Sequence, residues 1–459
     1  MDCFHITGGR PLRGSVRVNG SKNACLPLMA AALLTDQPVT LRNVPDLSDI
    51  RNMQRLLDSL GCRLSADGEA LTIHADDPSQ VVAHYDIVRT MRAGICVLGP
   101  LLASRGEARV SMPGGCAIGD RPVDLHLRGL EALGATITLD AGYIVAHAPA
   151  AGPGKARRLR GAHVFLGGPN GSTALGTANV MSAAALAHGT TVIECAACEP
   201  EIVDVGNLLI AMGANITGLG SPRITIQGVE SLHEADHPVM PDRIEAGTYL
   251  MAAAITHGDV SLQNFPTDTL TAALDRLREI GVTIERQPNP TTHDQTPSPP
   301  SPPPPGKPAA TPVPAAGLYD TVRIATSRRL NPVQVVTQPH PGFPTDLQAQ
   351  IMALLTLADG NAIVTEKIFP DRFLHVAELL RMGARITRVG PSAMITGVRE
   401  LVGAPVMASD LRASAGLVIA GLAARGHTTI NRVYHLDRGY DRMEVTLQQL
   451  GAQIERAKE

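Results

Sequence analysis

The sequence predicts an α/β fold assembled from six repeated helix–strand units. In each unit a segment with helical apolar spacing is followed by glycine and then by alternating aliphatic residues. The six copies are LGCRL (60–64), LGATI (133–137), MGANI (212–216), IGVTI (280–284), MGARI (382–386) and LGAQI (450–454). A chain of 459 residues is too long for one compact core. Its 44% apolar and 18% charged residues are typical of a globular protein.

The glycine of each copy is predicted to end its helix in the left-handed conformation, where a residue without Cβ is favoured. The alternation that follows predicts a strand. Six units of similar length indicate repeated supersecondary modules that bury a shared core. The period alone leaves open whether the units form a solenoid or closed domains.

A proline-rich segment interrupts this repeat between the fourth and fifth units. Residues 287–316 hold 12 of the 35 prolines of the chain. Such a composition cannot build a packed core, so the segment is predicted to be a disordered, partly polyproline II insertion. A docking segment for a proline-recognising domain is the alternative, although proline-rich segments commonly act as plain spacers.

Composition excludes several classes of partner. Aromatic residues make up only 3%, tryptophan is absent and the net charge is −3, which argues against nucleic acid and against a membrane surface. The N-terminal segment has no apolar signal-peptide core, and the apolar run 24–34 is too short to span a bilayer. Seven irregularly spaced cysteines favour free thiols in a reducing compartment, so we expect a cytoplasmic protein.

The segment PGGCAIGDRPVDLHL (113–127) is the strongest candidate for chemistry. Its Gly-Gly pair lets the backbone and the thiol of Cys116 approach a small ligand closely. The guanidinium of Arg121 suits phosphate or carboxylate, and a thiol beside a fixed cation loses its proton easily. Cys116 is therefore a candidate acid or nucleophile, with a buried structural cysteine as the alternative.

Three further patterns allow both a structural and a chemical interpretation. Lys22 follows the strand-like SVRV (15–18) and opens a helix, where a lysine can hold phosphate. Asp346 in FPTDLQAQ stands at a predicted helix start, where an aspartate can simply stabilise the N-terminus. Cys195 and Cys198 form a CxxC, but no second ligand pair supports zinc, and a thioredoxin-like site would need its own fold context.

Taken together, the motifs resemble the UDP-N-acetylglucosamine 1-carboxyvinyltransferases, a family of enolpyruvyl transferases. The resemblance covers nearly the whole chain outside the proline-rich segment, where the family has only a short connection. Beyond the Cys116 loop it rests on GGRPLRGSVRVNGSKNACLP (8–27), RTMRAGICVLGPLLA (89–103), EPEIVD (199–204), MPDRIEAGTYLMAAAI (240–255), PGFPTDLQAQ (341–350), MASDLRASAGLVIAG (407–421) and YHLDRGYDRMEVTLQQLGAQIER (434–456).

The resemblance implies two globular domains, each built from three α/β units whose helices pack inward, an inside-out α/β barrel. Residues 22–240 would form the first domain, which carries the Cys116 loop. Residues 1–21 and 241–459 would form the second, with 287–316 as an insertion. The active site would lie in the interdomain cleft, which can close and exclude water.

The resemblance also implies the site residues. Cys116, Asp346, Lys22 and Arg438 are the expected catalytic residues. The expected substrate-binding residues are Lys22, Asn23, Arg92, Arg121, Pro122, Val123, Asp124, Leu125, Thr173, Asp346, Ile368, Arg412 and Arg438. The loop around Thr173, NGSTALG (170–176), departs from the commoner form of the family. Asp242 and Asp410 also match positions near the cleft, with a structural salt bridge as the alternative for each.

The implied reaction moves the enolpyruvyl group of phosphoenolpyruvate onto the 3′-hydroxyl of UDP-N-acetylglucosamine, with release of phosphate, at the start of peptidoglycan synthesis. It needs no metal or organic cofactor, and no obligate protein partner is expected. The family's cysteine is alkylated by fosfomycin, so Cys116 implies sensitivity to that antibiotic. The alternatives are the sister enzyme acting on shikimate 3-phosphate and a non-catalytic UDP-sugar-binding paralogue.

Overall fold

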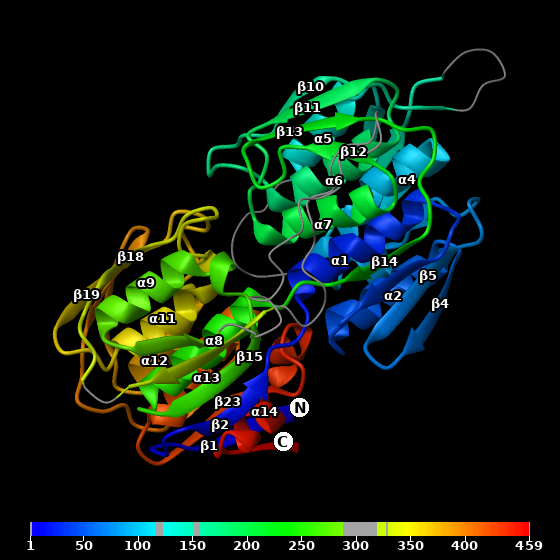
Figure 1. The fold of residues 1–459 in the computed structure, drawn as a ribbon. Coiled ribbons are helices and arrows are strands. Elements are labelled where there is room, and N and C mark those ends of the chain that lie inside the picture. Colours follow the sequence, from blue (N-terminus) through cyan, green and yellow to red (C-terminus); the bar gives the residue numbers. More distant parts are fainter. Residues whose placement is uncertain (1, 115–122, 151–156, 288–318, 327–328, 459) are drawn as a thin grey trace.

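The computed structural model describes residues 2–114, 123–150, 157–287, 319–326 and 329–458, and these residues form two lobes (Figure 1). Each lobe contains three four-stranded sheets. All six sheets share one topology, because each has one parallel pair of strands followed by two antiparallel pairs. The repeat that the sequence predicts is therefore a repeat of one supersecondary unit.

The three sheets of the first lobe draw their strands from residues 39–238. In order across the sheet, the first contains β14 (Ala235–Pro238), β3 (Val39–Arg42), β5 (Ala70–Ala75) and β4 (Cys62–Asp67). The second contains β6 (Val82–Ala83), β7 (Glu107–Ser111), β9 (Tyr143–His147) and β8 (Thr136–Asp140). The third contains β10 (His163–Phe165), β11 (Thr190–Glu194), β13 (Arg223–Gln227) and β12 (Asn215–Thr217).

In the second lobe the N-terminal strands join strands from the C-terminal half. The first sheet contains β2 (Arg13–Arg17), β15 (Asp259–Phe265), β17 (Asp320–Ala325) and β16 (Thr283–Gln287). The second contains β18 (Gln334–Val336), β19 (Asn361–Thr365), β21 (Ser392–Thr396) and β20 (Arg385–Val389). The third contains β22 (Pro405–Met407), β23 (His427–Asn431), β1 (Asp2–Thr7) and β24 (Gln453–Lys458).

The six repeat glycines behave as the sequence predicts. Their φ angles are 81° at Gly61, 90° at Gly134, 103° at Gly213 and Gly281, 89° at Gly383 and 88° at Gly451. Each lies between a helix and an edge strand of its sheet, namely β4, β8, β12, β16, β20 or β24. A side chain at these left-handed positions would be strained, which is why glycine recurs there.

Two helices accompany each sheet. In the first lobe these are α1 (Lys22–Ala31), α2 (Ser48–Ser59), α4 (Leu98–Arg105), α5 (Asp124–Ala132), α6 (Ala174–Ala185) and α7 (Pro200–Ala211), with a short α3 (Tyr85–Val88) besides. In the second lobe they are α8 (Arg243–Ile255), α9 (Thr271–Ile280), α11 (Gln348–Leu355), α12 (Leu374–Arg381), α13 (Leu411–Ala423) and α14 (Met443–Gln449).

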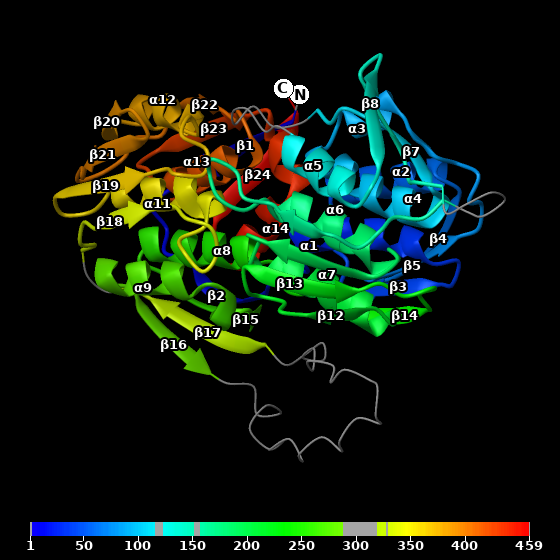
Figure 2. The ribbon, with the colours of Figure 1, turned by 90° about the horizontal axis from the view of Figure 1, so that it is seen from above.

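The inner helices of the second lobe are buried on every face and consist mostly of apolar residues. All residues of α8 and α11, and all of α13 except its last, are buried. These three helices contact one another, and Figure 2 shows them at the centre of the lobe with sheets around them. Because a helix that is hydrophobic all round must be enclosed, the sequence itself requires helices inside and sheets outside. The inside-out α/β architecture is thereby confirmed.

The apolar core is divided between the lobes. One cluster of buried residues runs from Ala24 to Met240. The other combines residues from Phe4 to Val18 with residues from Ile244 to Ile454. The N-terminal strands β1 and β2 therefore contribute to the second core. None of the helices in the described ranges is both long and apolar enough to cross a bilayer.

The proline-rich segment falls almost wholly outside the described residues. Strand β16 ends at Gln287 and the description resumes at residue 319, just before β17. β16 and β17 pair as an antiparallel hairpin in which Gln287 faces Thr321. The insertion therefore connects two neighbouring ends of one hairpin. Its expected disorder stays a prediction.

The second lobe contains a titratable group that predicts a pH dependence of stability. His375 is 1% exposed and its Nε2 lies 3.3 Å from Met352 Sδ. Burial lowers the pKa of His375 to about 4, and the nearby charges of Asp410 and Arg372 oppose each other. The unfolded chain takes up this proton near the ordinary value of about 6.5, well before the folded chain does.

We therefore expect His375 to stabilise the fold fully above pH 6.5 and to lose this contribution as the pH falls toward 4. Between pH 7.5 and 4.5 wild type should lose on the order of 2–3 kcal/mol relative to His375→Leu, which cannot protonate. Urea unfolding of both proteins at both pH values measures the difference. A difference that does not change with pH would contradict the buried neutral histidine.

Candidate active site

The chain passes between the lobes twice, and the two crossings lie side by side. Gly20 and Pro241 form an antiparallel bridge, and the amide of Ser21 donates to the carbonyl of Met240 at 2.7 Å. A Cβ at Gly20 would lie 1.8 Å from the carbonyl oxygen of Asn43, so only glycine fits there. The crossings thus bring the start of α1 and the start of α8 to one place.

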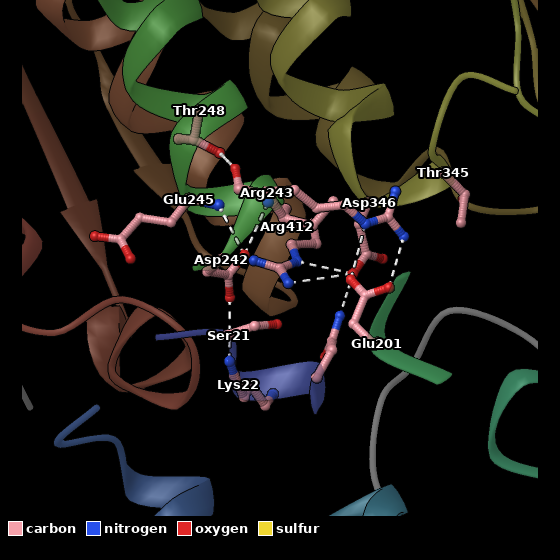
Figure 3. A network of polar contacts seen from close by, with 12 residues as sticks. Ser21, Lys22, Glu201, Asp242, Arg243, Glu245, Thr248, Thr345, Asp346 and Arg412 are labelled. Atoms are coloured by element: carbon pink, nitrogen blue, oxygen red, sulfur yellow. Dashed lines mark hydrogen bonds and ion pairs between the residues drawn. The ribbon is translucent and has the colours of Figure 1, made fainter. Parts of the chain in front are cut away.

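Lys22 opens α1 at this junction, as the sequence predicts. Ser21 caps the helix, and its hydroxyl accepts the amide of Ala24. The backbone amide of Lys22 donates to Asp242 Oδ2 at 3.2 Å (Figure 3). The side chain is only 9% exposed. A buried ammonium group needs a compensating charge, which a neighbouring helix supplies.

Asp49 compensates two cations, one from each lobe. It lies in the first turn of α2, and its side chain is 3% exposed. Its Oδ2 is 2.7 Å from Lys22 Nζ. Its Oδ1 accepts from Arg438 Nε at 3.0 Å, and its Oδ2 accepts from Arg438 Nη2 at 3.3 Å. Arg438 belongs to the short turn Val433–Arg438 of the second lobe, so this carboxylate joins the lobes.

The electrostatic balance at Asp49 favours the charged form. Burial by itself raises the pKa of Asp49, but the charges and hydrogen bonds of Lys22 and Arg438 outweigh it and hold the pKa below its usual value. Asp49 is therefore an ionised carboxylate at neutral pH. Lys22 and Arg438, both expected site residues, meet on an anion that the resemblance did not indicate.

A second carboxylate, Asp346, lies among cations and an amide. Its Oδ1 is 2.9 Å from Arg372 Nη1, and its Oδ2 is 3.2 Å from both Arg412 Nε and Nη2. Asn23 Nδ2 donates to Oδ2 at 3.3 Å from the first lobe. Figure 3 shows Arg412 and Asp346 facing each other above Lys22. Asp346 lies in the first turn of the 3₁₀ helix Thr345–Leu347, which has no side-chain cap and leads directly into α11. It therefore stands at a helix start, as the sequence predicts, where a carboxylate is favoured.

Arg412 is the most enclosed of these cations. Its side chain is 3% exposed. Burial disfavours its charge, but Asp346, Tyr440 and Asp242 together outweigh burial and raise the pKa of Arg412 above its ordinary value. The guanidinium is therefore permanently charged inside the protein. It can offer an anion a fixed positive charge that needs no reorganisation.

Asp242 and Asp410 are helix caps. Asp242 Oδ1 accepts the amides of Ile244 and Glu245 at 2.8 and 3.0 Å at the start of α8. Asp410 Oδ1 accepts the amides of Arg412 and Ala413 at 3.0 and 3.1 Å at the start of α13. Each carboxylate therefore has a capping role, which neither the cleft interpretation nor the salt-bridge interpretation named. Asp242 caps α8 and also accepts the amide of Lys22, so it fixes the position of Lys22. Asp410 caps α13, whose first turn carries Arg412, so it fixes the position of Arg412.

Part of the Cys116 loop lies outside the described residues, which omit 115–122 and hence Cys116, Arg121 and Pro122. The described end of the loop is Val123, which is buried, followed by Asp124 in the first turn of α5. Arg92, another expected site residue, begins a 3₁₀ helix, Arg92–Val97, in the same lobe.

Two segments expected to hold the nucleotide lie against each other. A Cβ at Gly168 would lie 3.1 Å from Leu125 Cδ1, so the end of the Cys116 loop touches the loop before α6. Thr173 caps α6 by accepting the amide of Gly176 at 3.2 Å. The hydroxyl of Thr173 thus has a structural partner already. Gly171 is close to Pro339 of the other lobe.

Ile368 stands in a turn that a buried glutamate organises. Glu366 is 0% exposed, and its Oε1 accepts the amide of Ile368 at 2.7 Å. Its Oε2 accepts from Thr345 Oγ1 at 2.8 Å, next to Asp346. Glu366 therefore fixes Ile368 relative to Asp346, so two expected site residues share one anchor.

Sequence reasoning missed Asp49, Glu366 and Arg372. Arg372 is 7% exposed and donates from Nη1 to both Thr345 Oγ1 and Asp346 Oδ1. Arg372 could have been found from the sequence, because it stands only four residues after the expected site residue Ile368. A carboxylate such as Asp346 commonly pairs with an arginine. Asp49 carries no comparable signal, since an aspartate in the first turn of a helix is ordinary.

Cys195 and Cys198 are half-buried free thiols. Cys195 has φ 58°, and burial with the nearby Glu199 raises the pKa of Cys198. Across the described part of the chain, no three His, Cys, Asp or Glu side chains gather as metal ligands. Nothing in this geometry assigns chemistry to the CxxC.

Comparisons with known proteins identify the family. The family model described as EPSP synthase (3-phosphoshikimate 1-carboxyvinyltransferase) matches residues 6–447. A protein of Nitratidesulfovibrio vulgaris (strain DSM 19637 / Miyazaki F) named UDP-N-acetylglucosamine 1-carboxyvinyltransferase is 49% identical over 459 residues, with 100% of both chains covered. A protein of the same name from Dinoroseobacter shibae (strain DSM 16493 / NCIMB 14021 / DFL 12) is 51% identical over 461 residues, again with 100% of both chains covered.

Solved structures share the fold at lower identity. The enolpyruvyl transferase NikO from Streptomyces tendae matches with a TM-score of 0.82 at 24% identity, over 100% of this chain and 99% of that one. EPSP synthase from Acinetobacter baumannii matches with a TM-score of 0.71 at 18% identity, over 100% of both chains. Full-length relatives at about half identity and the shared fold lead to one conclusion: this chain is a member of the enolpyruvyl transferase family and groups with its UDP-N-acetylglucosamine 1-carboxyvinyltransferases.

Proposed function

We propose that this chain transfers the enolpyruvyl group of phosphoenolpyruvate to the 3′-hydroxyl of UDP-N-acetylglucosamine and releases phosphate, the first committed step of peptidoglycan synthesis. The observation that carries the proposal is the meeting of buried cations from both lobes. Lys22 and Arg438 face Asp49, while Arg372 and Arg412 face Asp346. Phosphoenolpyruvate carries a phosphate and a carboxylate, so it needs several fixed cations.

Lys22, Arg412 and Arg438 hold the phosphate and carboxylate of phosphoenolpyruvate. Each is a buried or nearly buried cation whose charge the protein already compensates with a carboxylate. In such a site the donors are oriented before the ligand arrives and stabilise charge that develops during the reaction. Asn23 and Arg92 complete the anion site in this proposal.

Asp346 accepts the proton of the sugar 3′-hydroxyl as its oxygen attacks C2 of phosphoenolpyruvate. C3 gains a proton in the same addition, and Cys116 is the proposed acid. Loss of a proton from C3 then expels phosphate and restores the enol ether, so atoms and charge balance. A single catalytic acid or base contributes about a hundredfold to ten-thousandfold.

The nucleotide lies along the first lobe. Arg121, Pro122, Val123, Asp124 and Leu125 grip the uridine in this proposal, with Thr173 beside them. The contact between Leu125 and the loop before α6 supports this placement, because both segments then line one surface. Ile368 contacts the sugar from the second lobe, where Glu366 holds its backbone close to Asp346.

The lobes are the proposed domains, 22–240 and 1–21 with 241–459. The two separate apolar cores support this division. Closure of the domains would exclude water from the reacting groups. The reaction is assigned to the cytoplasm, in keeping with free thiols at all six described cysteines.

The direct test is phosphate release from phosphoenolpyruvate with and without UDP-N-acetylglucosamine. We expect release only with the sugar nucleotide, and a rate at least about a hundredfold lower in Cys116→Ser. Cys195→Ser, which changes a thiol outside the proposed machinery, serves as the matched control and should keep the wild-type rate. Turnover of shikimate 3-phosphate in place of the nucleotide sugar, or equal activity of Cys116→Ser, would contradict the proposal.

Fosfomycin provides an independent test of Cys116. Incubation of active enzyme with the epoxide should abolish phosphate release and add one fosfomycin mass to the protein. Mass spectrometry of the tryptic peptide containing Cys116 locates the adduct. Full activity after incubation, or an adduct on another cysteine, would count against Cys116 as the reactive thiol.

Asp49→Asn tests the carboxylate between the lobes. The substitution removes the buried anion that Lys22 and Arg438 share, so the free energy of unfolding should fall by on the order of 3 kcal/mol. Inorganic phosphate should then raise the melting temperature of the variant more than that of wild type, because phosphate can replace the lost charge.

The matched control for Asp49→Asn is Asp46→Asn, since Asp46 forms an exposed ion pair with Arg51 just outside the same helix. Exposed pairs contribute little, so its stability should stay close to wild type. An equal phosphate effect in Asp49→Asn and wild type would argue against an anion site at Lys22 and Arg438.

A further inference from the structure

A buried tyrosine hydroxyl lies where the inner helices of the second lobe converge. Tyr440 is 1% exposed and follows Arg438 by two residues. Its hydroxyl is 2.8 Å from Thr248 Oγ1 of α8 and 3.3 Å from Arg412 Nη1 of α13. Gln350 of α11 lies beside both, with its Nε2 3.1 Å from Thr248 Oγ1. One phenol oxygen thus contacts the network formed by three helices.

The direction of the hydrogen bonds in this cluster follows from counting protons. Thr248 Oγ1 lies 2.7 Å from the carbonyl oxygen of Ile244, which can only accept, so the threonine proton points there. Tyr440 must then donate its own proton to Thr248. Arg412 Nη1 can only donate, so the phenol oxygen accepts from the guanidinium, and it accepts from Gln350 Nε2 as well, at 3.4 Å.

The same cluster reaches Asp346 by two routes. Arg412 uses Nε and Nη2 for Asp346 Oδ2 and Nη1 for Tyr440, so its guanidinium is held on two sides. Gln350 Nε2 donates to the backbone carbonyl of Asp346 at 3.0 Å. Both the side chain and the backbone of Asp346 are therefore tied to groups that the Tyr440–Thr248 pair orients.

Tyr440 accepts a hydrogen bond from Arg412 through a hydroxyl that stays neutral. Its ring also lies under Arg412, with the guanidinium carbon 5.6 Å from the ring centroid. Burial raises the pKa of Tyr440, which outweighs the opposing effect of Arg412, so the phenol keeps its proton at neutral pH. A neutral oxygen fixes Arg412 without competing with Asp346 or with a bound anion for its charge.

We propose that the hydroxyl of Tyr440 is a positioning residue for the reaction: oriented by Thr248, it fixes the Arg412 guanidinium and, through it, the Asp346 carboxylate. This inference rests on the proposed function, since it assigns Arg412 to the anion and Asp346 to the sugar hydroxyl. An arginine fixed before the ligand binds loses less side-chain freedom in the complex. Misplacement of a reacting group by a small distance is costly in rate.

Tyr440→Phe keeps the ring and removes only the hydroxyl. We expect kcat to fall about tenfold to a hundredfold, the factor that a hydrogen bond to a charged group contributes. The KM for UDP-N-acetylglucosamine should stay within about twofold, because the uridine contacts lie in the other lobe. Tyr249→Phe is the matched control. It removes a fully buried hydroxyl from the same core, and no hydrogen bond joins that hydroxyl to Arg412 or Thr248 among the described residues.

Thr248 provides a second pair of variants. Thr248→Val keeps the shape but removes the acceptor for Tyr440, so its kcat should fall as in Tyr440→Phe. Thr248→Ser retains the hydroxyl and should restore most of the rate. A purely structural role would lower the melting temperature in both tyrosine variants and in Thr248→Val without a selective loss of kcat.

A double-mutant cycle with Arg412→Lys decides whether Tyr440 acts through Arg412. Lysine lacks the guanidinium fork, so Tyr440→Phe should cost little further activity in that background. If the double variant lost kcat by the product of the two single-variant factors, the proposal would be overturned. A kcat within twofold of wild type in both Tyr440→Phe and Thr248→Val would overturn it as well. The wild-type rate separates the proposed function from the proposed role of Tyr440. An inactive wild type would contradict the proposed function. An active wild type with unaffected variants would contradict only the role of Tyr440.

Discussion

Charge balance between the lobes is the constraint on which the site depends. Burying Lys22, Arg412 and Arg438 without anions would be prohibitive. Asp49 and Asp346 remove this cost, and each accepts from residues of both lobes, since Arg438 reaches Asp49 and Asn23 reaches Asp346. The two carboxylates therefore keep cations ready inside the protein while holding the halves of the site in register.

The fold was largely predictable because its signals are local. A glycine with positive φ between helix and strand recurs at Gly61, Gly134 and four further positions, and each marks the end of a helix and the start of an edge strand. The long apolar run Tyr249–Ile255 of α8 likewise requires enclosure. The sequence period alone could not distinguish a solenoid from closed lobes, because the pairing of β1 and β2 with C-terminal strands is a long-range event.

The site was predictable only where residue type and local context coincide. Lys22 at a helix start and Asp346 before an apolar helix carry such signals, although the resemblance supplied their roles. Asp49 and Tyr440 carry none, because their significance depends on partners distant in the sequence, Arg438 at 389 residues from Asp49 and Thr248 at 192 residues from Tyr440. Asp242 and Asp410 proved to be caps, since an aspartate before a helix has backbone amides within reach before any distant cation.

The hairpin of β16 and β17 has a consequence for how this chain can vary in length. Its strands are already paired from Thr283 and Ala325 to Gln287 and Thr321, so the fold closes the intervening segment at no expense to the cores. Doubling such a segment costs only about 0.6 kcal/mol in closure entropy. The connection between β16 and β17 is thus a position where the enzyme tolerates insertions. The chain can lengthen there in evolution, and a label can be inserted there by experiment.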